Sequence, residues 1–182
     1  SATMGSEQTP GWSRTLAACV DEGLIDRDRL LDALLDMLAA DLPSGRAGWY
    51  SRTLRMLSMT LDEAEARQGA LCTLMSAPVG ATVTVAVRQL SALSKAGRLD
   101  LELFARSCEG ALMGSKANAL AALTILRGGL SSVESADLEG LLGVALSFPH
   151  AQVQGLAIEL ASDALRSGLL DSAAVGRLLS DA

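Results

Sequence analysis

Three short phrases recur along the chain and decide its fold: GLID at residues 23–26, GRLD at 97–100 and GLLD at 168–171. Each phrase has the chemistry of a joint between two helices. Its glycine tolerates the left-handed conformation that closes one helix, and its aspartate can accept hydrogen bonds from the amide groups that begin the next. An apolar residue between the two can pack across the corner. The repeated phrase therefore predicts repeated pairs of helices.

Dividing the chain at these joints gives five units of nearly equal length. Residues 1–8 lack both the positive charge and the apolar run of a signal peptide, so we interpret them as a tag remnant or a disordered end. The units span residues 9–44, 45–77, 78–114, 115–148 and 149–182. Near-constant length is typical of stacked helical pairs. We therefore expect residues 9–182 to form a single helical-repeat domain, an all-α solenoid of about five antiparallel helix pairs in a right-handed superhelix.

The second helix of each unit should begin after a side chain that caps it. The predicted N-caps are Asp26, Thr60, Asp100, Ser135 and Asp171. Thr60 is followed three residues later by Glu63, which is the spacing of a capping box. A good cap contributes about 1 kcal/mol to stability, so we assign these residues a structural role and not a ligand-binding one.

Two stretches require a choice between structures. Residues 81–87, ATVTVAV, alternate polar and apolar residues as a half-buried strand does. The apolar positions from Val79 to Leu93 recur at helical spacing over a longer window, which favours a helix. Residues 140–158 carry no formal charge and are nominally long enough to cross a bilayer. Polar residues within them favour two helices joined at Phe148 and Pro149.

The first two units also have similar sequences at their starts. WSRTL occupies residues 12–16 and WYSRTL occupies residues 49–54. We interpret Trp12 and Trp49 as packing residues between neighbouring first helices. The alternative is a binding role for Trp49 and Tyr50.

Composition favours an intracellular helical protein with an acidic surface. Apolar residues make up 49% of the chain and aromatic residues 3%, so the core must be built from Leu, Ala and Val, which suit helix packing. The net charge of −6 would repel a phosphate backbone unless basic residues gather on one face. Cys19, Cys72 and Cys108 are odd in number and far apart, which indicates reduced, structural thiols and a cytoplasmic location.

The common catalytic and cofactor-binding motifs are missing from the sequence. There is no glycine-rich phosphate loop, no nucleophile elbow and no HExxH, and His150 is the single histidine. Asp28, Asp32 and Asp36 share one side of a predicted helix, where a solvated face is a better interpretation than an acid–base site. We therefore expect no enzyme activity, no cofactor and no metal site.

Positive charge is carried almost entirely by arginine, which suits bidentate contacts with carboxylates and phosphates. The second helices of solenoids commonly line the recognition surface. Arg67, Arg106 and Arg177 lie partway along three predicted second helices, so they are the candidate binding residues. The alternative is that these arginines pair with neighbouring Glu and Asp.

The five units with their Gly/Asp joints resemble HEAT and armadillo-type repeats over nearly the whole chain after residue 9. The bias toward Ala, Leu, Gly and Arg, as in DRDRLLDALLDMLAADLPSGRAGWYSRTLRML, is also similar to helical-repeat regions of large uncharacterised actinobacterial proteins. That similarity implies that the chain is a piece of a longer protein. One HEAT-like group comprises DNA glycosylases with a basic, aromatic groove. Only Trp49, Tyr50, Arg52 and Arg55 could begin such a groove, and the acidic charge departs from that pattern.

The sequence thus predicts a non-enzymatic protein–protein interaction or scaffold module that presents an extended helical surface to a protein partner. The alternative is a HEAT-like nucleic-acid-binding protein, or an enzyme of the DNA glycosylase type, that uses a concave groove. We expect neither nucleic acid nor a membrane as the partner. Val175, Leu178 and Leu179 leave the last unit apolar, so either self-association through this C-terminal unit or a longer parent protein would cover them.

Overall fold

A computed structural model describes residues 9–40 and 42–180, and within these ranges the chain is all-α, as predicted. The proposed tag remnant, residues 1–8, lies outside them. Five helices form a first layer: α1 (Thr9–Asp21), α3 (Ser44–Leu57), α6 (Gly80–Lys95), α9 (Lys116–Gly128) and α11 (Ala151–Arg166). The second layer contains α2 (Arg27–Ala39), α4 (Leu61–Ala66), α5 (Gln68–Thr73), α7 (Leu101–Ser107), α8 (Glu109–Met113), α10 (Ser135–Leu146) and α12 (Ser172–Ser180). Short 3₁₀ turns follow α5 at Leu74–Ser76 and α9 at Leu130–Ser132.

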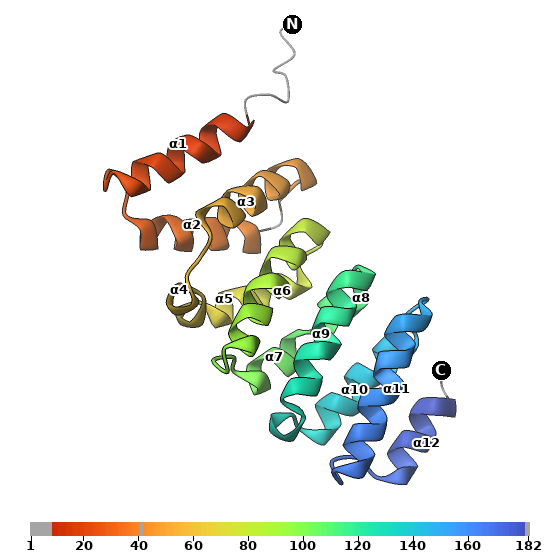
Figure 1. The fold of residues 1–182 in the computed structure, drawn as a ribbon. Coiled ribbons are helices and arrows are strands. Elements are labelled where there is room, and N and C mark those ends of the chain that lie inside the picture. Colours follow the sequence, from red (N-terminus) through yellow and green to blue (C-terminus); the bar gives the residue numbers. More distant parts are fainter. Residues whose placement is uncertain (1–8, 41, 181–182) are drawn as a thin grey trace, which may run out of the picture.

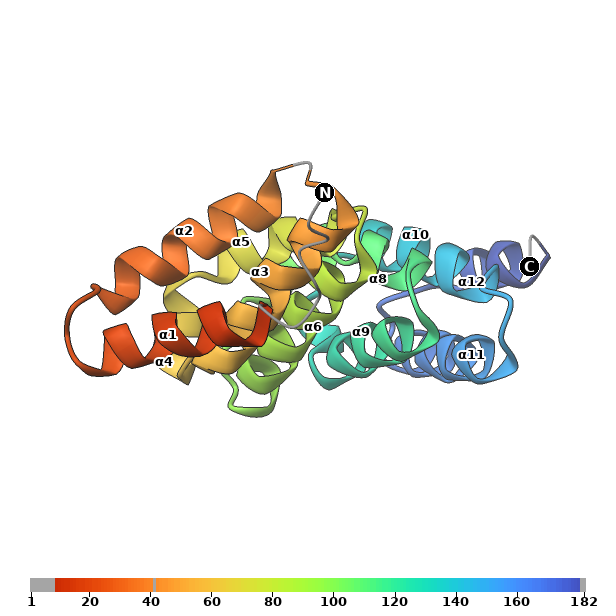
Figure 2. The ribbon, with the colours of Figure 1, turned by 90° about the horizontal axis from the view of Figure 1, so that it is seen from above.

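The helices are stacked in chain order. Figure 1 shows the chain advancing from α1 to α12 along one direction, and Figure 2 shows α3, α6, α9 and α11 on one side with α2, α5, α10 and α12 on the other. First helices contact one another in sequence, α1 with α3, α3 with α6, α6 with α9, and α9 with α11. In the second layer α2 contacts α5, α5 contacts α7, and α10 contacts both α8 and α12. The first-helix layer is therefore a continuous surface that crosses all five units.

The glycines of the three recurring phrases close first helices as predicted. Gly23, Gly97 and Gly168 have φ angles of 72°, 69° and 75°, in the left-handed region that favours glycine. The aspartates that follow cap the second helices. The Asp26 carboxylate accepts a hydrogen bond from the amide of Arg29, and the Asp100 carboxylate accepts one from the amide of Leu103.

The remaining predicted caps give two confirmations and one correction. Asp171 accepts a hydrogen bond from the amide of Ala174 at 2.7 Å. Thr60 and Glu63 form the full capping box. The prediction for Ser135 was wrong by one residue, because Glu134 is the N-cap of α10 and Ser135 is the first helical residue. The Glu134 side chain makes no capping hydrogen bond, so the local sequence contains no clear signal for the start of α10.

Two second helices are interrupted. Arg67 separates α4 from α5, and Cys108 separates α7 from α8. The second interruption brings Gly110 against the backbone of the preceding unit, where a Cβ atom would lie 2.4 Å from the carbonyl oxygen of Met75. The contact joins two units and is not a property of the local sequence.

The two ambiguous stretches are helical. Residues 81–87 lie inside α6, and residues 140–158 are divided between α10 and α11 by a turn at residues 147–150. Among the described residues, no helix combines the length and hydropathy that crossing a membrane requires.

The packing role expected for Trp12 was wrong. The Trp12 side chain is 65% exposed, because the α1 surface that faces α3 is provided by residues such as Ser13. Trp49 is half-buried and packs edge-on against Tyr50, with 4.8 Å between the ring centroids.

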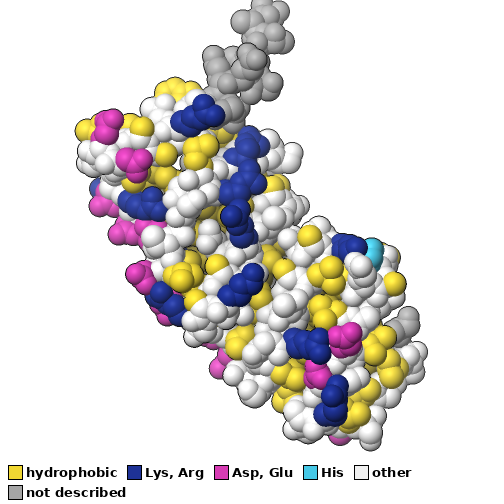
Figure 3. Space-filling view, viewed as in Figure 1, with side chains coloured by type: hydrophobic (Ala, Val, Ile, Leu, Met, Phe, Trp, Pro, Cys, Tyr) yellow, Lys and Arg dark blue, Asp and Glu magenta, His cyan; other side chains and the backbone are white. Residues whose placement is uncertain are grey.

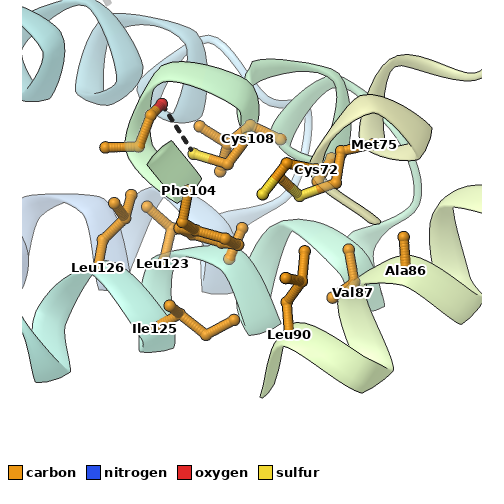
Figure 4. Packing of buried hydrophobic residues seen from close by; sticks show 14 of the residues in the cluster. Cys72, Met75, Ala86, Val87, Leu90, Phe104, Cys108, Leu123, Ile125 and Leu126 are labelled. Carbon is orange, nitrogen blue, oxygen red and sulfur yellow. Dashed lines mark hydrogen bonds between the residues drawn. The ribbon is translucent and has the colours of Figure 1, made fainter. Parts of the chain in front are cut away.

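The core runs without interruption between the two layers. Figure 4 shows Phe104 of α7 surrounded by Leu90 of α6 and Leu123 and Leu126 of α9, all fully buried. Cys72 and Cys108 lie in the same cluster as free thiols. Burial raises the pKa of Cys72 to about 11 and that of Cys108 to about 12, so both thiols stay protonated, which is consistent with a structural role.

Polar bridges link successive first helices beneath this layer's surface. Three side-chain pairs make these hydrogen bonds: Ser13 with Thr53 at 2.7 Å, Ser51 with Thr82 at 3.3 Å, and Asn118 with Thr84 at 3.3 Å. Each pair joins one unit to the next. Because a buried polar group without a partner is costly, these bridges favour one register between adjacent helices.

Candidate functional site

The three arginines predicted as binding residues occupy different interfaces between units. Arg67 donates hydrogen bonds to the carboxylates of Asp32 at 2.6 Å and Asp28 at 2.8 Å, both on α2. Only 11% of its side chain is exposed. The guanidinium group of Arg67 therefore links α2 to the end of α4 and is already engaged.

Arg106 and Arg177 also pair with acidic residues. Arg106 contacts Glu102 in its own helix and Glu134 at 3.6 Å in the next unit. Arg177 of α12 donates to Glu139 of α10 at 2.8 Å. The structure thus gives each of these arginines carboxylate neighbours, and it does not bring Arg67, Arg106 and Arg177 together.

Similar ion pairs connect the first three units along the second layer. Arg27 donates to Glu63 at 2.5 Å, and Arg98 contacts both Asp62 and Glu65. The hydrogen bond from Arg27 lowers the pKa of Glu63, and the backbone amide of Thr60 adds to this effect. Asp28 and Asp32, predicted to form a solvated face, are exposed but serve as partners of Arg67. Acidic residues on this layer are therefore used to join units.

Three neighbouring helices of the first layer, α3, α6 and α9, have the opposite charge pattern, whereas α1 contains Asp21 and α11 contains Glu159 and Asp163. Helices α3, α6 and α9 contain no Asp or Glu, whereas the second-layer helices α2, α4, α7, α8 and α10 contain ten. The basic residues of α3, α6 and α9 are Arg46, Arg52, Arg55, Arg88, Lys95, Lys116 and Arg127. Figure 3 shows a column of Lys and Arg side chains over the region of α3 and α6, with Asp and Glu confined to the edge there. Positive charge is thus gathered on one face of an acidic protein.

A groove lies between α3 and α6 within this basic face. Its volume is about 320 Å³, and three exposed arginines line it: Arg52 and Arg55 from α3, and Arg88 from α6. Small residues form part of its wall. A Cβ atom on Gly48 would lie 3.4 Å from Nη1 of Arg52, so the Arg52 guanidinium group folds back over this glycine.

The three guanidinium groups have no counterion among the residues that the structure describes. Within residues 9–40 and 42–180, no carboxylate lies within ion-pair distance of Arg52, Arg55 or Arg88, and no acceptor takes a hydrogen bond from their side chains. Arginine binds planar anions such as carboxylates and phosphates with two parallel hydrogen bonds. The groove can therefore hold an anion supplied from outside the described part of the chain.

Sequence reasoning found part of this group. Arg52 and Arg55 were named as residues that could begin a basic groove, but Arg88 was missed. The aromatic residues named with them, Trp49 and Tyr50, pack against each other and do not line the groove. The missing signal was the lack of acidic residues across three first helices, which can be read from the sequence once the helix bounds are known.

Other chemistry-bearing residues have structural roles. His150 is the N-cap of α11, where its Nδ1 accepts a hydrogen bond from the amide of Gln152. No group of His, Cys, Asp and Glu in the described part of the chain could hold a metal ion. The α3–α6 groove remains the candidate site because three arginines without carboxylate partners among the described residues line it.

The chain matches the model of one protein family over residues 1–119, a range that includes the whole α3–α6 groove. No curated protein matches the chain. No solved structure matches it either. Because the family match covers well over half of the sequence, the chain belongs to the family described as Domain of unknown function (DUF6493).

Proposed function

We propose that this protein is a non-enzymatic interaction module that binds an acidic protein partner along its first-helix layer. The observation that carries the proposal is the absence of acidic residues from three neighbouring helices of the first layer. Helices α3, α6 and α9 present only basic charged residues, although the whole chain has a net charge of −6. Separation of this kind does not help the fold itself, because like charges on neighbouring helices repel.

The architecture that we propose for this surface is a HEAT-like, right-handed α-solenoid. Supporting this, each pair of helices with extensive contacts belongs to one unit or to two consecutive units. Stacking of this kind gives a long surface whose length grows with the number of units. Such surfaces suit extended protein segments.

An acidic protein segment fits the charges better than nucleic acid does. A polynucleotide would bring a dense row of phosphates close to the acidic second layer and to a net charge of −6. Single strands also bind by stacking bases on exposed aromatic rings. Among the basic helices α3, α6 and α9, only α3 carries aromatic rings, and its half-buried Trp49 and Tyr50 are packed against each other, whereas the exposed Trp12 lies on α1. We also propose a cytoplasmic location, in keeping with three free cysteines.

Affinity purification from cells that express the protein would test this function. Three forms should be compared: the wild type, the double variant Arg52→Glu/Arg55→Glu, and the control Arg29→Glu, which changes an exposed arginine on α2. We expect an acidic protein to be retained by the wild type and the control and lost with the double variant. Retention of the same proteins by all three forms, and also by a form with Arg46→Glu/Lys95→Glu, would contradict the proposal. Recovery of nucleic acid that is lost with rising salt would favour the alternative function.

Self-association through the C-terminal unit is a second proposal, carried by one exposed apolar side chain of α12. Leu179 is 55% exposed, whereas Leu178 is buried. Sedimentation of the wild type and of Leu179→Gln over a range of concentrations would test it. Dimers in the wild type that are reduced in the variant would support self-association, and monomers throughout would exclude it.

A further inference from the structure

The interface between α9 and α11 shows how this fold places a counterion beside a first-helix arginine. Arg127 of α9 donates hydrogen bonds to Glu159 at 2.8 Å and to Asp163 at 3.0 Å, both on α11. This is an ion pair within the first-helix layer. It gives a reference for the α3–α6 groove.

The two interfaces have corresponding positions. Arg88 lies nine residues before Gly97, and Glu159 lies nine residues before Gly168, where both glycines have positive φ and close the helix. On the other helix of each interface, Arg55 follows the buried Leu54 of α3, and Arg127 follows the buried Leu126 of α9.

Three further buried positions support the second correspondence. Ala47, Ser51 and Thr53 of α3 match Ala119, Leu123 and Ile125 of α9 in spacing. Arg55 therefore corresponds to Arg127, and Arg88 corresponds to Glu159.

The α3–α6 interface thus has an arginine at the position where the α9–α11 interface has a carboxylate. Arg55 and Arg88 line one groove with Arg52, and like charges that share a groove repel one another. A carboxylate from another molecule would restore the pattern seen at Arg127. The groove therefore has the charge arrangement of an ion pair from which one partner is missing.

We propose that the α3–α6 groove binds the carboxylate side chains of an acidic segment in the partner protein, held by Arg52, Arg55 and Arg88. This inference rests on the proposed function and names the site and the chemistry of its ligand. A carboxylate that enters the groove takes the place that Glu159 has beside Arg127.

The other polar groups of the groove favour an anion over a neutral ligand. The Ser51 hydroxyl is bonded to Thr82. The Thr84 hydroxyl donates to the carbonyl oxygen of Gly80 and accepts from Asn118. The guanidinium groups are therefore the charged donors that remain for a ligand, and they bind charged acceptors most strongly.

A binding assay with defined peptides would test the site directly. The probe is a fluorescein-labelled peptide of three Glu-Glu-Gly-Ser repeats, and the matched control replaces each Glu with Gln. The protein forms are the wild type, Arg52→Gln/Arg55→Gln/Arg88→Gln, and the control Arg29→Gln. The replaced side chains are exposed, and thermal unfolding would verify that each variant folds.

We expect the acidic peptide to bind the wild type and the Arg29→Gln control equally, and the triple variant about 10-fold more weakly, since each exposed pair contributes about twofold to threefold. The Gln peptide should bind weakly to all three forms. Equal affinity of the acidic peptide for the wild type and the triple variant would overturn the inference. So would tighter binding of a single-stranded oligonucleotide at the same salt concentration, or displacement of the peptide by inorganic phosphate at equal concentration.

The Arg88→Glu variant gives an independent test. It places a carboxylate where α11 has Glu159, so Arg55 gains an internal partner and the acidic peptide should lose at least as much affinity as in the triple variant. Full retention of peptide binding by Arg88→Glu would count against the groove as the site.

The inference and the proposed function can fail separately. If the cellular partner is lost with Arg46→Glu/Lys95→Glu but retained by the groove triple variant, the basic layer binds the partner and the groove is not the site. If no partner depends on any basic residue of this layer, the proposed function itself fails.

Discussion

The α9–α11 and α3–α6 interfaces have similar buried positions and different surface charges. At α9–α11, Arg127 is neutralised by Glu159 and Asp163. At α3–α6, the corresponding Arg55 shares a groove with Arg88. No carboxylate of the described residues lies within ion-pair distance of Arg55. One interface completes its ion pairs internally, and the other leaves cations at the surface. The difference separates residues that hold units together from residues that are available to a partner.

The largest expected effect tests whether the two interfaces have equivalent cores. Leu54→Ala and Leu126→Ala each remove a fully buried side chain at corresponding positions. Both should lower the free energy of unfolding by about 2–5 kcal/mol, from lost burial and from the cavity left behind. Urea denaturation followed by circular dichroism would measure it. A loss of unfolding free energy in only one of the two variants would show that the cores of the interfaces are not equivalent.

An ion pair on the second layer indicates how much a completed ion pair contributes to the free energy of unfolding. Glu63→Gln weakens the contact with Arg27 and alters the capping box, and it should cost about 1–2 kcal/mol at neutral pH. Because the folded protein lowers the pKa of Glu63, its contribution is fully present above the ordinary glutamate pKa of about 4.3. It is lost as the pH falls through the lowered value. The difference in unfolding free energy between wild type and variant should therefore shrink in acid, and a difference that grows there would contradict this assignment.

Converting the α3–α6 interface to the α9–α11 pattern should stabilise it. Arg88→Glu removes one like charge from the groove and supplies a carboxylate at the position that corresponds to Glu159, so we expect a gain of about 0.5–1 kcal/mol. Arg88→Gln is the matched control, since it removes the repulsion without adding a carboxylate, and its gain should be smaller. Thermal unfolding at low salt would measure both. A loss of stability in Arg88→Glu would show that Arg55 and Arg88 do not interact.

The smallest expected effect is a response to salt that differs between the interfaces. Raising the salt concentration screens the repulsion at α3–α6 and the attraction at α9–α11, because the charges at both places are exposed. Hydrogen exchange should slow slightly in α3 and α6 and quicken slightly in α9 and α11. Mass spectrometry of peptides from these helices would detect it. The same direction of change in all four helices would argue against the charge comparison.

The helical pairing could be predicted because its signals are local. The glycine and aspartate of each recurring phrase act within a few residues, so Gly97 and Asp100 could be assigned from their spacing alone. The interruption at Cys108 could not, because it accompanies the close approach of Gly110 to Met75 in another unit. Local patterns carry no information on such contacts.

The candidate site was harder to predict for a similar reason. Arg67 was chosen from its place along a second helix, but its role is set by Asp28 and Asp32 on a neighbouring helix. Arg88 became recognisable only when the packing of α6 against α3 placed it in one groove with Arg52 and Arg55. A charged residue's function here depends on the residue opposite it, and this is set by the register between helices.

The hydrogen bond between Ser51 and Thr82 has a further consequence for recognition. It joins α3 to α6 next to the groove, since Ser51 is itself one of the lining residues. The backbones that carry Arg52 and Arg88 are therefore held at a set separation before any ligand arrives. An incoming acidic segment has only to order the guanidinium side chains and itself, which limits the loss of conformational entropy on association.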